Sequence, residues 1–253
     1  MIIRSVIALI ILCGLGIPSS YADRITIASS NYYPHYGENL PQQGVVTEII
    51  RQAFALQGIE TDITFMPFAR AYRETQLGNY TALSAAWYHD SRTQYFLYSQ
   101  PMYANHIVFF KHKDQSITYR DFTDLKQQRY RLAVVQGYSQ PEGLLESGIN
   151  TEKVASDEQM FQMLALGRVD LVVADRLNGL YLLQQNLPQY ADKLEWMRPI
   201  LETRPMYLLL SKQDPRSEEL MQQFNRGLQQ LQQSGQYQQI IQSMLPQYRA
   251  NKS

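Results

Sequence analysis

A repeated alternation of strand-like and helix-like segments is the feature that most constrains the fold of this chain. In the first run, apolar alternation predicts strands at 24–28, 61–65 and 82–86. Between them, apolar residues fall on one helical face over 45–54, and a second helix is predicted at 69–76. Strand-helix-strand order of this kind favours an α/β unit with a parallel sheet.

A second unit of the same kind follows a strand predicted at 107–111. Strands are predicted at 132–135 and 171–174, a helix start at 142–146, and a capped helix at 160–166 behind Ser156 and Gln159. A last strand, 206–210, precedes a helix that begins at Asp214-Pro215.

Two α/β units joined by two extended crossings describe a bilobed fold with a ligand cleft between the lobes. The predicted division places 23–105 and 210–253 in lobe 1 and 106–209 in lobe 2. Ligands of open α/β sheets bind at the carboxyl ends of strands. Those ends carry 29–33, 87–92, 137–139 and Asp175.

The first 22 residues have the pattern of a cleavable export signal. Arg4 provides a basic start, Val6–Ile17 an apolar run, and Ser20-Tyr21-Ala22 a cleavage box. The run is shorter than the roughly 20 residues that span a bilayer, so a retained anchor is the weaker interpretation. We expect cleavage after Ala22 and a periplasmic mature protein.

Cysteine and charge exclude several functions. Cys13 is the only cysteine, and Leu12 before it does not fit a lipidation signal, so the mature chain should lack disulfides and thiol chemistry. The four histidines show no metal-ligand spacing, and we expect no metal and no cofactor. Loss of Arg4 reduces 23 basic residues to 22 against 23 acidic ones, which argues against a nucleic-acid partner.

Three side chains are candidate ligand contacts. Arg92 carries a planar fork of donors that fits a carboxylate. Trp87 could stack on a flat or sugar-like ligand, or cap the core at a strand end. Arg70 could be a second anion contact, although a solvated arginine in the first turn of a helix is the stronger interpretation.

The motifs together resemble the bacterial extracellular solute-binding proteins of family 3, the periplasmic amino-acid-binding proteins of ABC transporters. The resemblance runs over 25–245. It rests on these segments: Tyr32-x-Pro34; Gly44; Arg92 with Tyr98-Ser99-x-Pro101-x-Tyr103; Asp124-Leu125; Val135-x-Gly137-x-Ser139; Leu164-x-x-Gly167-Arg168-Val169-Asp170 with Asp175; and Phe224-Asn225 with Gly235-x-Tyr237.

The resemblance implies a type II periplasmic-binding-protein fold and a set of roles. Arg92 would hold a ligand carboxylate with help from the Ser139 hydroxyl, Asp175 would take a ligand ammonium, and Tyr32 would pack on the ligand side chain. An arginine and an acid on opposite lobes form a clamp that a zwitterion would bridge. Ala85, Ala86 and Trp87 depart from the small hydroxyl residues usual in the family, which leaves ligand identity open.

We therefore expect a monomeric, non-enzymatic binding protein that passes an amino acid or related carboxylate to an inner-membrane permease. Two alternatives stay open. One is a periplasmic-binding-fold enzyme such as a cyclic-acid dehydratase, with Asp175 or Glu142 as proton donor. The other is a ligand-sensing partner of a membrane receptor.

Overall fold

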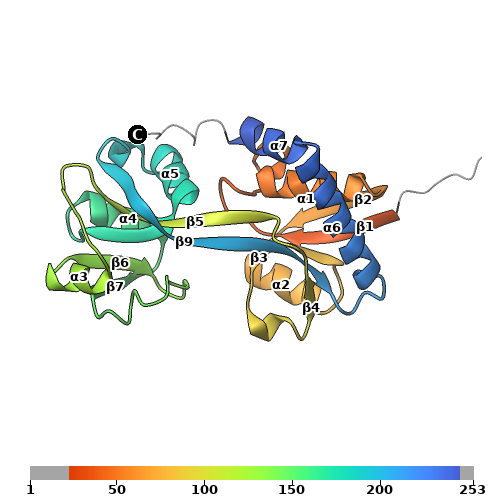
Figure 1. The fold of residues 1–253 in the computed structure, drawn as a ribbon, viewed down its shortest axis with the longest axis horizontal. Helices are drawn as coiled ribbons and strands as arrows, with labels where there is room; N and C mark the ends of the chain where they lie inside the picture. The colour runs from red at the N-terminus through yellow and green to blue at the C-terminus, as the bar shows by residue number, and fades with distance from the viewer. Residues whose placement is uncertain (1–22, 246–253) are drawn as a thin grey trace, which may run out of the picture.

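Two lobes joined by two long strands make up the protein, as the computed structural model of residues 23–245 shows (Figure 1). The crossing strands are β5 (Tyr103–His112) and β9 (Leu194–Ser211), which pair antiparallel along most of their length. The predicted leader at 1–22, with Cys13, lies outside the described residues.

Lobe 1 is a mixed sheet with helices on both faces. Strand β1 runs parallel to β2 and β3, and β3 pairs antiparallel with β9. Its elements are β1 (Asp23–Ser29), η1 (Pro41–Gln43), α1 (Val45–Ala55), β2 (Ile59–Phe65), α2 (Phe68–Gln76), β3 (Ala82–Trp87), η2 (Asp90–Arg92), β4 (Phe96–Tyr98), α6 (Ser217–Gln233) and α7 (Gln236–Met244).

Lobe 2 repeats this plan on a smaller scale. Strand β6 runs parallel to β7 and β8, while β8 pairs antiparallel with β5. Its elements are α3 (Phe122–Gln127), β6 (Arg131–Val135), β7 (Asn150–Val154), α4 (Asp157–Ala165), β8 (Leu171–Asp175), α5 (Arg176–Gln185) and η3 (Pro188–Tyr190). The parallel arrangement predicted for each unit is confirmed, and the crossing strands add the antiparallel pairs.

Helices α1 and α6 form the main cover of one face of lobe 1. The predicted apolar stripe of α1 is buried, and Phe54 packs against Phe224 of α6 with ring centroids 5.1 Å apart. The helices meet closely at Gly227, where an added Cβ would lie 1.9 Å from the carbonyl oxygen of Ala53. The glutamine-rich face of α6 is left on the outside because the apolar period continues through it.

Four segments differ from expectation. Residues 142–146 form consecutive turns, not a helix start, because Gly143 adopts a left-handed φ of 78° that breaks the helical path. Strand β7 and helix α5 were not predicted. Strand β9 begins at Leu194, twelve residues before the predicted strand.

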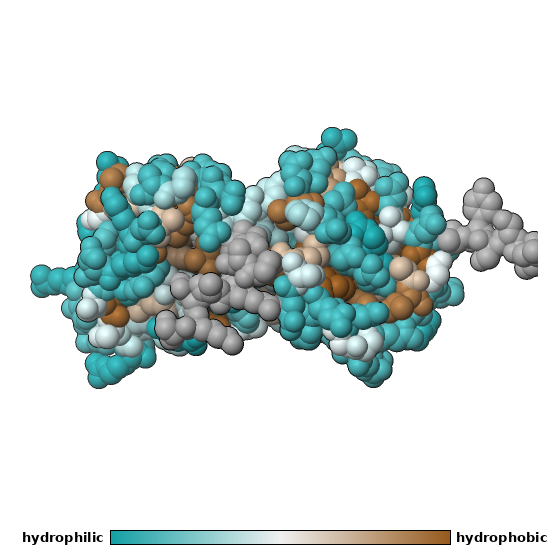
Figure 2. All heavy atoms as spheres, turned by 90° about the horizontal axis from the view of Figure 1, so that it is seen from above, coloured by the Kyte–Doolittle hydropathy of each residue, from teal (hydrophilic) through white to brown (hydrophobic). Residues whose placement is uncertain are grey.

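The predicted lobe boundaries, 105/106 and 209/210, fall inside β5 and β9. We keep them as a proposal, since the strands themselves belong to both lobes. Figure 2 shows a waist between the lobes and a mostly hydrophilic surface on the face it presents. Within residues 23–245, every helix is too short or too polar to span a lipid bilayer.

Candidate functional site

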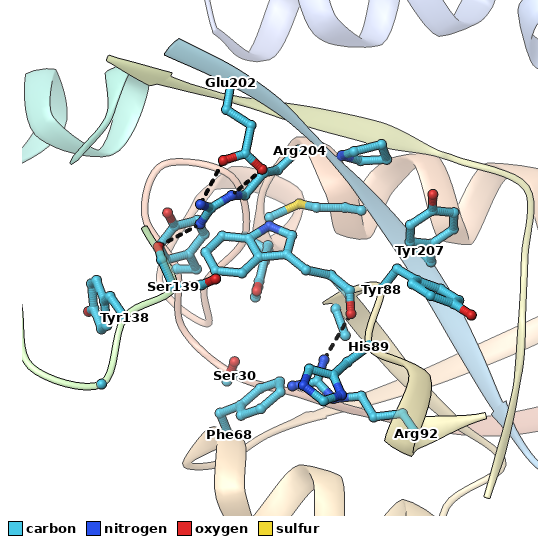
Figure 3. Close-up of a pocket in the computed structure, with 18 of the residues that line it drawn as sticks. Ser30, Phe68, Tyr88, His89, Arg92, Tyr138, Ser139, Glu202, Arg204 and Tyr207 are labelled. Carbon is cyan, nitrogen blue, oxygen red and sulfur yellow. Dashed lines mark hydrogen bonds and ion pairs between the residues drawn. The ribbon is translucent and has the colours of Figure 1, made fainter. Parts of the chain in front are cut away.

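A cavity of about 880 Å³ lies at the junction of the two lobes. Its walls come from the end of β1, the end of β3 with η2, the turn after β6, and β9 (Figure 3). A volume of this size is typical of small-molecule sites. The lining residues are Ser30, Asn31, Tyr32, Tyr36, Phe68, Ala85, Ala86, Trp87, Tyr88, His89, Arg92, Gly137, Tyr138, Ser139, Glu202, Arg204, Pro205, Met206 and Tyr207.

Arg92 lies at one end of this cavity, in the short helix η2 that follows β3 (Figure 3). Its Nη1 donates to the carbonyl oxygen of Trp87 at 2.9 Å. The guanidinium lies over the rings of Phe68 and Tyr72, 5.7 and 5.6 Å from their centroids. Among residues 23–245 no carboxylate pairs with Arg92, so the fork keeps donors for an anion from outside the chain.

Trp87 and Tyr32 form an aromatic wall of the cavity. Their rings meet edge to face with centroids 6.5 Å apart, and Tyr32 also stacks on His35. The indole Nε1 of Trp87 donates to Oδ1 of Asn105 at 3.0 Å, which fixes the ring plane. Trp87 is half-buried and lines the cavity, so it has both the core contact and the ligand-facing surface that the sequence left open.

Arg204 and Glu202 are functional residues that sequence reasoning missed. Arg204 is buried on β9, and its Nε and Nη2 donate to the two carboxylate oxygens of Glu202, both at 2.8 Å (Figure 3). Its Nη1 donates to the carbonyl oxygen of Ser139 at 2.9 Å, and its guanidinium lies 5.0 Å from the Trp87 ring centroid. The pair is internally neutral, which leaves Arg92 as the arginine of the cavity without a counter-ion.

No alternation in the sequence identifies this pair. Residues 202 and 204–207 line the cavity, so neighbouring as well as alternate positions of β9 contribute to it. The sequence predicted a strand only from 206 onward, which left Glu202 and Arg204 outside the expected element.

Asp175 lies at the hinge, with only 4% of its surface exposed. Its Oδ1 accepts from Nε2 of His35 and from the backbone N–H of Asn178, both at 2.8 Å. Its Oδ2 accepts from Nδ2 of Asn105 at 3.1 Å and from the backbone N–H of His106 at 3.2 Å. A ligand ammonium would have to displace one of these four donors to reach the carboxylate.

The pKa of Asp175 reflects this enclosure. Burial would raise the pKa, but His35, Asn178 and Asn105 outweigh burial and hold the pKa below its ordinary value. Since His35 belongs to lobe 1 and Asp175 ends β8 of lobe 2, the bond joins the two lobes at the back of the cavity. Asn178 adds a second tie by donating to the carbonyl oxygen of Tyr33 at 2.7 Å.

The remaining predicted residues separate into two groups. Ser139 lines the cavity from the turn after β6, as the strand-end argument predicted. Arg70 is exposed in the first turn of α2 and lines neither of the two cavities described here, which agrees with the solvated role.

Solved structures similar to this chain share its fold. ArgBP from T. maritima, as a mutant, has a TM-score of 0.65 at 18% identity, covering 88% of this chain and 95% of that one. Substrate binding domain 2 of GlnP from Lactococcus lactis, in an open conformation, has 0.66 at 22%, covering 88% and 95%. The GluR0 ligand-binding core from Nostoc punctiforme, in complex with L-glutamate, has 0.64 at 20%, covering 87% and 98%.

These likenesses establish the two-lobe fold of type II periplasmic binding proteins. A comparison with curated protein sequences found no match. The family model, in contrast, matches nearly the whole of the predicted mature chain, over residues 25–247. The chain therefore belongs to the bacterial extracellular solute-binding proteins, family 3.

Proposed function

We propose that this chain is a periplasmic protein that captures a small polar solute, an amino acid or related carboxylate, and delivers it to an ABC-type importer. One observation carries the proposal. Arg92, without a counter-ion among the described residues, faces a cavity of about 880 Å³ whose walls come from both lobes. An anion held there would contact both lobes and favour their closure.

The carboxylate of the solute would pair with the free donors of Arg92, and Ser139 would add a contact from lobe 2. Trp87 and Tyr32 would pack against the body of the solute. Membership of the family supports binding over catalysis. The dehydratase alternative finds little support, because Asp175 is saturated with donors and Glu142 is exposed in a turn that does not line the cavity.

A thermal-shift screen of amino acids and small carboxylic acids tests the capture role. A solute at 100 times its dissociation constant adds about 2.7 kcal/mol to stability. For a chain of this size that corresponds to a rise in Tm of about 5 to 11 °C. Titration calorimetry then gives the dissociation constant of each hit for the parent and for Arg92→Ala.

Arg92→Ala should weaken binding of carboxylate ligands by about 2 to 5 kcal/mol. Arg70→Ala is the matched control, because it removes the same charge from the same lobe outside the cavity, and it should leave the dissociation constant unchanged. If Arg92→Ala binds every hit as tightly as the parent does, the proposal is wrong.

Lobe closure has its own measurement. Small-angle scattering at saturating ligand should give a lower radius of gyration than the ligand-free protein, with 23–105 and 210–253 moving against 106–209. An unchanged profile would contradict these lobe boundaries and the clamp. Delivery to a permease, in contrast with sensing, would be tested by reconstituting uptake with the transporter encoded nearest to this chain.

A further inference from the structure

A second, smaller cavity opens beside the main one. This annex has a volume of about 30 Å³ and shares Tyr32, Trp87, Tyr138, Ser139 and Arg204 with the main cavity. It adds Gln140, Asp157 and Asp175 to the surface that a solute could reach. A site that holds one water needs at least about 10 to 15 Å³, so the annex suits a single small polar group.

The annex adds the polar side chains of Gln140, Asp157, Asp175 and Asn178, together with the apolar Ile107, Val173 and Ala174. The side-chain Oε1 of Gln140 is buried and has no hydrogen-bond partner within residues 23–245, while its Nε2 donates to the carbonyl oxygen of Tyr138 at 3.2 Å. Asp157 receives one side-chain hydrogen bond, from the hydroxyl of Tyr138 at 3.0 Å. A buried acceptor without a donor costs free energy, which a donor from a ligand would recover.

Asp157 and Asp175 differ in how far the protein already satisfies them. Asp175 has four donors from the protein, as described above. Burial raises the pKa of Asp157 above its ordinary value, and the Tyr138 hydroxyl only partly offsets that effect. Among residues 23–245 no cation pairs with Asp157 and one side-chain donor reaches it, whereas four donors reach Asp175, so Asp157 keeps more capacity for a positive group.

The charges of Asp157 and Asp175 also act on the Tyr32 hydroxyl, which lines the annex. The pKa of the Tyr32 hydroxyl is raised well above its ordinary value, first by burial and then by the charges of Asp175 and Asp157. Arg204 lines the annex as well, but both of its carboxylate-facing nitrogens are committed to Glu202.

Two helices begin at the annex, and free helix N–H groups would favour an anion there. Both ends are already capped by side chains. Asp175 accepts from the N–H of Asn178 at the start of α5, and Ser156 accepts from the N–H of Gln159 at the start of α4. The polar groups that the annex offers to a ligand are therefore its hydrogen-bond acceptors.

We propose that the annex is the subsite for a protonated amine of the bound solute, with Asp157 as its counter-ion and Oε1 of Gln140 as a second acceptor. This inference rests on the proposed function, since it places one end of the solute whose carboxylate pairs with Arg92. It assigns the ammonium to Asp157, whereas the family resemblance assigns it to Asp175. The favoured ligand class is then an amino-carboxylic acid held by Arg92 and Asp157.

Matched ligand pairs test the assignment. L-Phenylalanine with 3-phenylpropanoate, L-leucine with 4-methylpentanoate, and L-glutamate with glutarate each differ by one amine, and their dissociation constants would be measured by calorimetry. The parent should prefer the amine-bearing member of the pair that it binds. Asp157→Asn should weaken that member by about thirty-fold or more and leave the amine-free member within about threefold.

Asp175→Asn is the comparison variant, because it neutralises the neighbouring acid. It should lower thermal stability and leave the ratio of the two affinities within about threefold. The inference would be overturned if the ratio of the two affinities were unchanged in Asp157→Asn, or if it were lost in Asp175→Asn. So would a parent protein that prefers the amine-free acids, although solute capture would then stand.

A second measurement does not need a cognate ligand. Carbon-13 NMR of the side-chain carboxyl groups would follow the titration of Asp157 in ammonium chloride and in tetramethylammonium chloride at the same concentration. Ammonium should lower the pKa of Asp157, and the larger tetramethylammonium, which exceeds the annex, should not. If both salts act alike the annex is not an amine site; if no acid of the panel binds the parent, the proposed function itself fails.

Discussion

Replacing His35 with alanine removes one of the four donors that hold the buried carboxylate of Asp175. His35 and Asp175 are each 1% exposed at the side chain, and Nε2 lies 2.8 Å from Oδ1. Nδ1 of His35 also lies 3.3 Å from the hydroxyl of Tyr103. The variant would leave a buried charge with three donors, and would remove a bond between the two lobes.

The size of the loss follows from this geometry. A hydrogen bond to a charged group contributes about 1.5 to 3 kcal/mol. Asn105, His106 and Asn178 still donate to Asp175 in the variant, so we expect a loss of about 2 kcal/mol. In a chain of this length that corresponds to a fall in Tm of about 4 to 8 °C.

The hydrogen bond from His35 to Asp175 also makes the stability of the folded protein depend on pH. Because the pKa of Asp175 is lower in the folded protein than in the unfolded chain, the unfolded chain binds the proton more readily. The stability from Asp175 is therefore fully present above the ordinary Asp value of 3.8 and is lost as pH falls through the folded-state value. In His35→Ala, folding stability should decrease less as the pH is lowered.

Urea unfolding of the parent, His35→Ala, Asp175→Asn and the double variant would measure the coupling between the two side chains. His112→Ala is the control, because it removes a partly exposed histidine whose partner Asp114 is 88% exposed, and it should change stability by less than about 0.5 kcal/mol. If Asp175→Asn costs as much without His35 as with it, the two side chains are not coupled and the hinge interpretation is refuted.

Three further experiments have defined outcomes. Gly227→Ala should destabilise by about 1 to 3 kcal/mol in urea unfolding despite the helix propensity of alanine, because its Cβ would lie 1.9 Å from the Ala53 carbonyl oxygen. Asp170→Asn should cost about 1 kcal/mol at neutral pH and little in acid, since Arg131 outweighs partial burial and holds the pKa of Asp170 below its ordinary value. Ligand-induced fluorescence change should vanish in Trp87→Phe and persist in Trp196→Phe, because only the first tryptophan lines the cavity.

Helix α1, which buries one face, was predictable from the sequence, and helix α5, which packs against two cores, was not. The stripe of α1 faces a single core, so its apolar period was clear. Helix α5 packs on both lobes: Leu182 and Leu183 join the core of lobe 2, while Leu177 packs against that of lobe 1. Apolar residues therefore surround α5, and no single face marks it as a helix.

Strand β9 was predicted only in part, for a different reason. Residues 206–210 pair with β3 and are mostly buried, which gives the apolar run that predicts a strand. Residues 194–205 pair with β5 alone and keep many side chains in solvent. A half-exposed crossing strand has no apolar alternation to detect. The part of β9 that carries Glu202 and Arg204 was therefore not predicted as a strand.

The expectation that ligands bind at strand ends located the region of the site. It could not show which acid in that region remains able to bind a ligand. Asp175 ends the buried strand β8, as that expectation requires. Which acid keeps capacity for a ligand depends on His35 and Asn105, which come from a loop and a crossing strand far away in sequence. Hydrogen bonds to a carboxylate from residues so distant in the sequence cannot be predicted from the spacing of motifs.

A continuous set of contacts runs from the cavity to the hinge. Arg204 lies over Trp87, Trp87 donates to Asn105, and Asn105 donates to Asp175, which His35 holds from the other lobe. A solute that stacks on Trp87 therefore contacts a side chain whose orientation depends on the residue that also holds the hinge acid. Energetic coupling needs a shared element rather than proximity alone, and Asn105 is that element here. The effects of Asn105→Ala and of bound ligand on stability should consequently not add, whereas those of Gly227→Ala and ligand should.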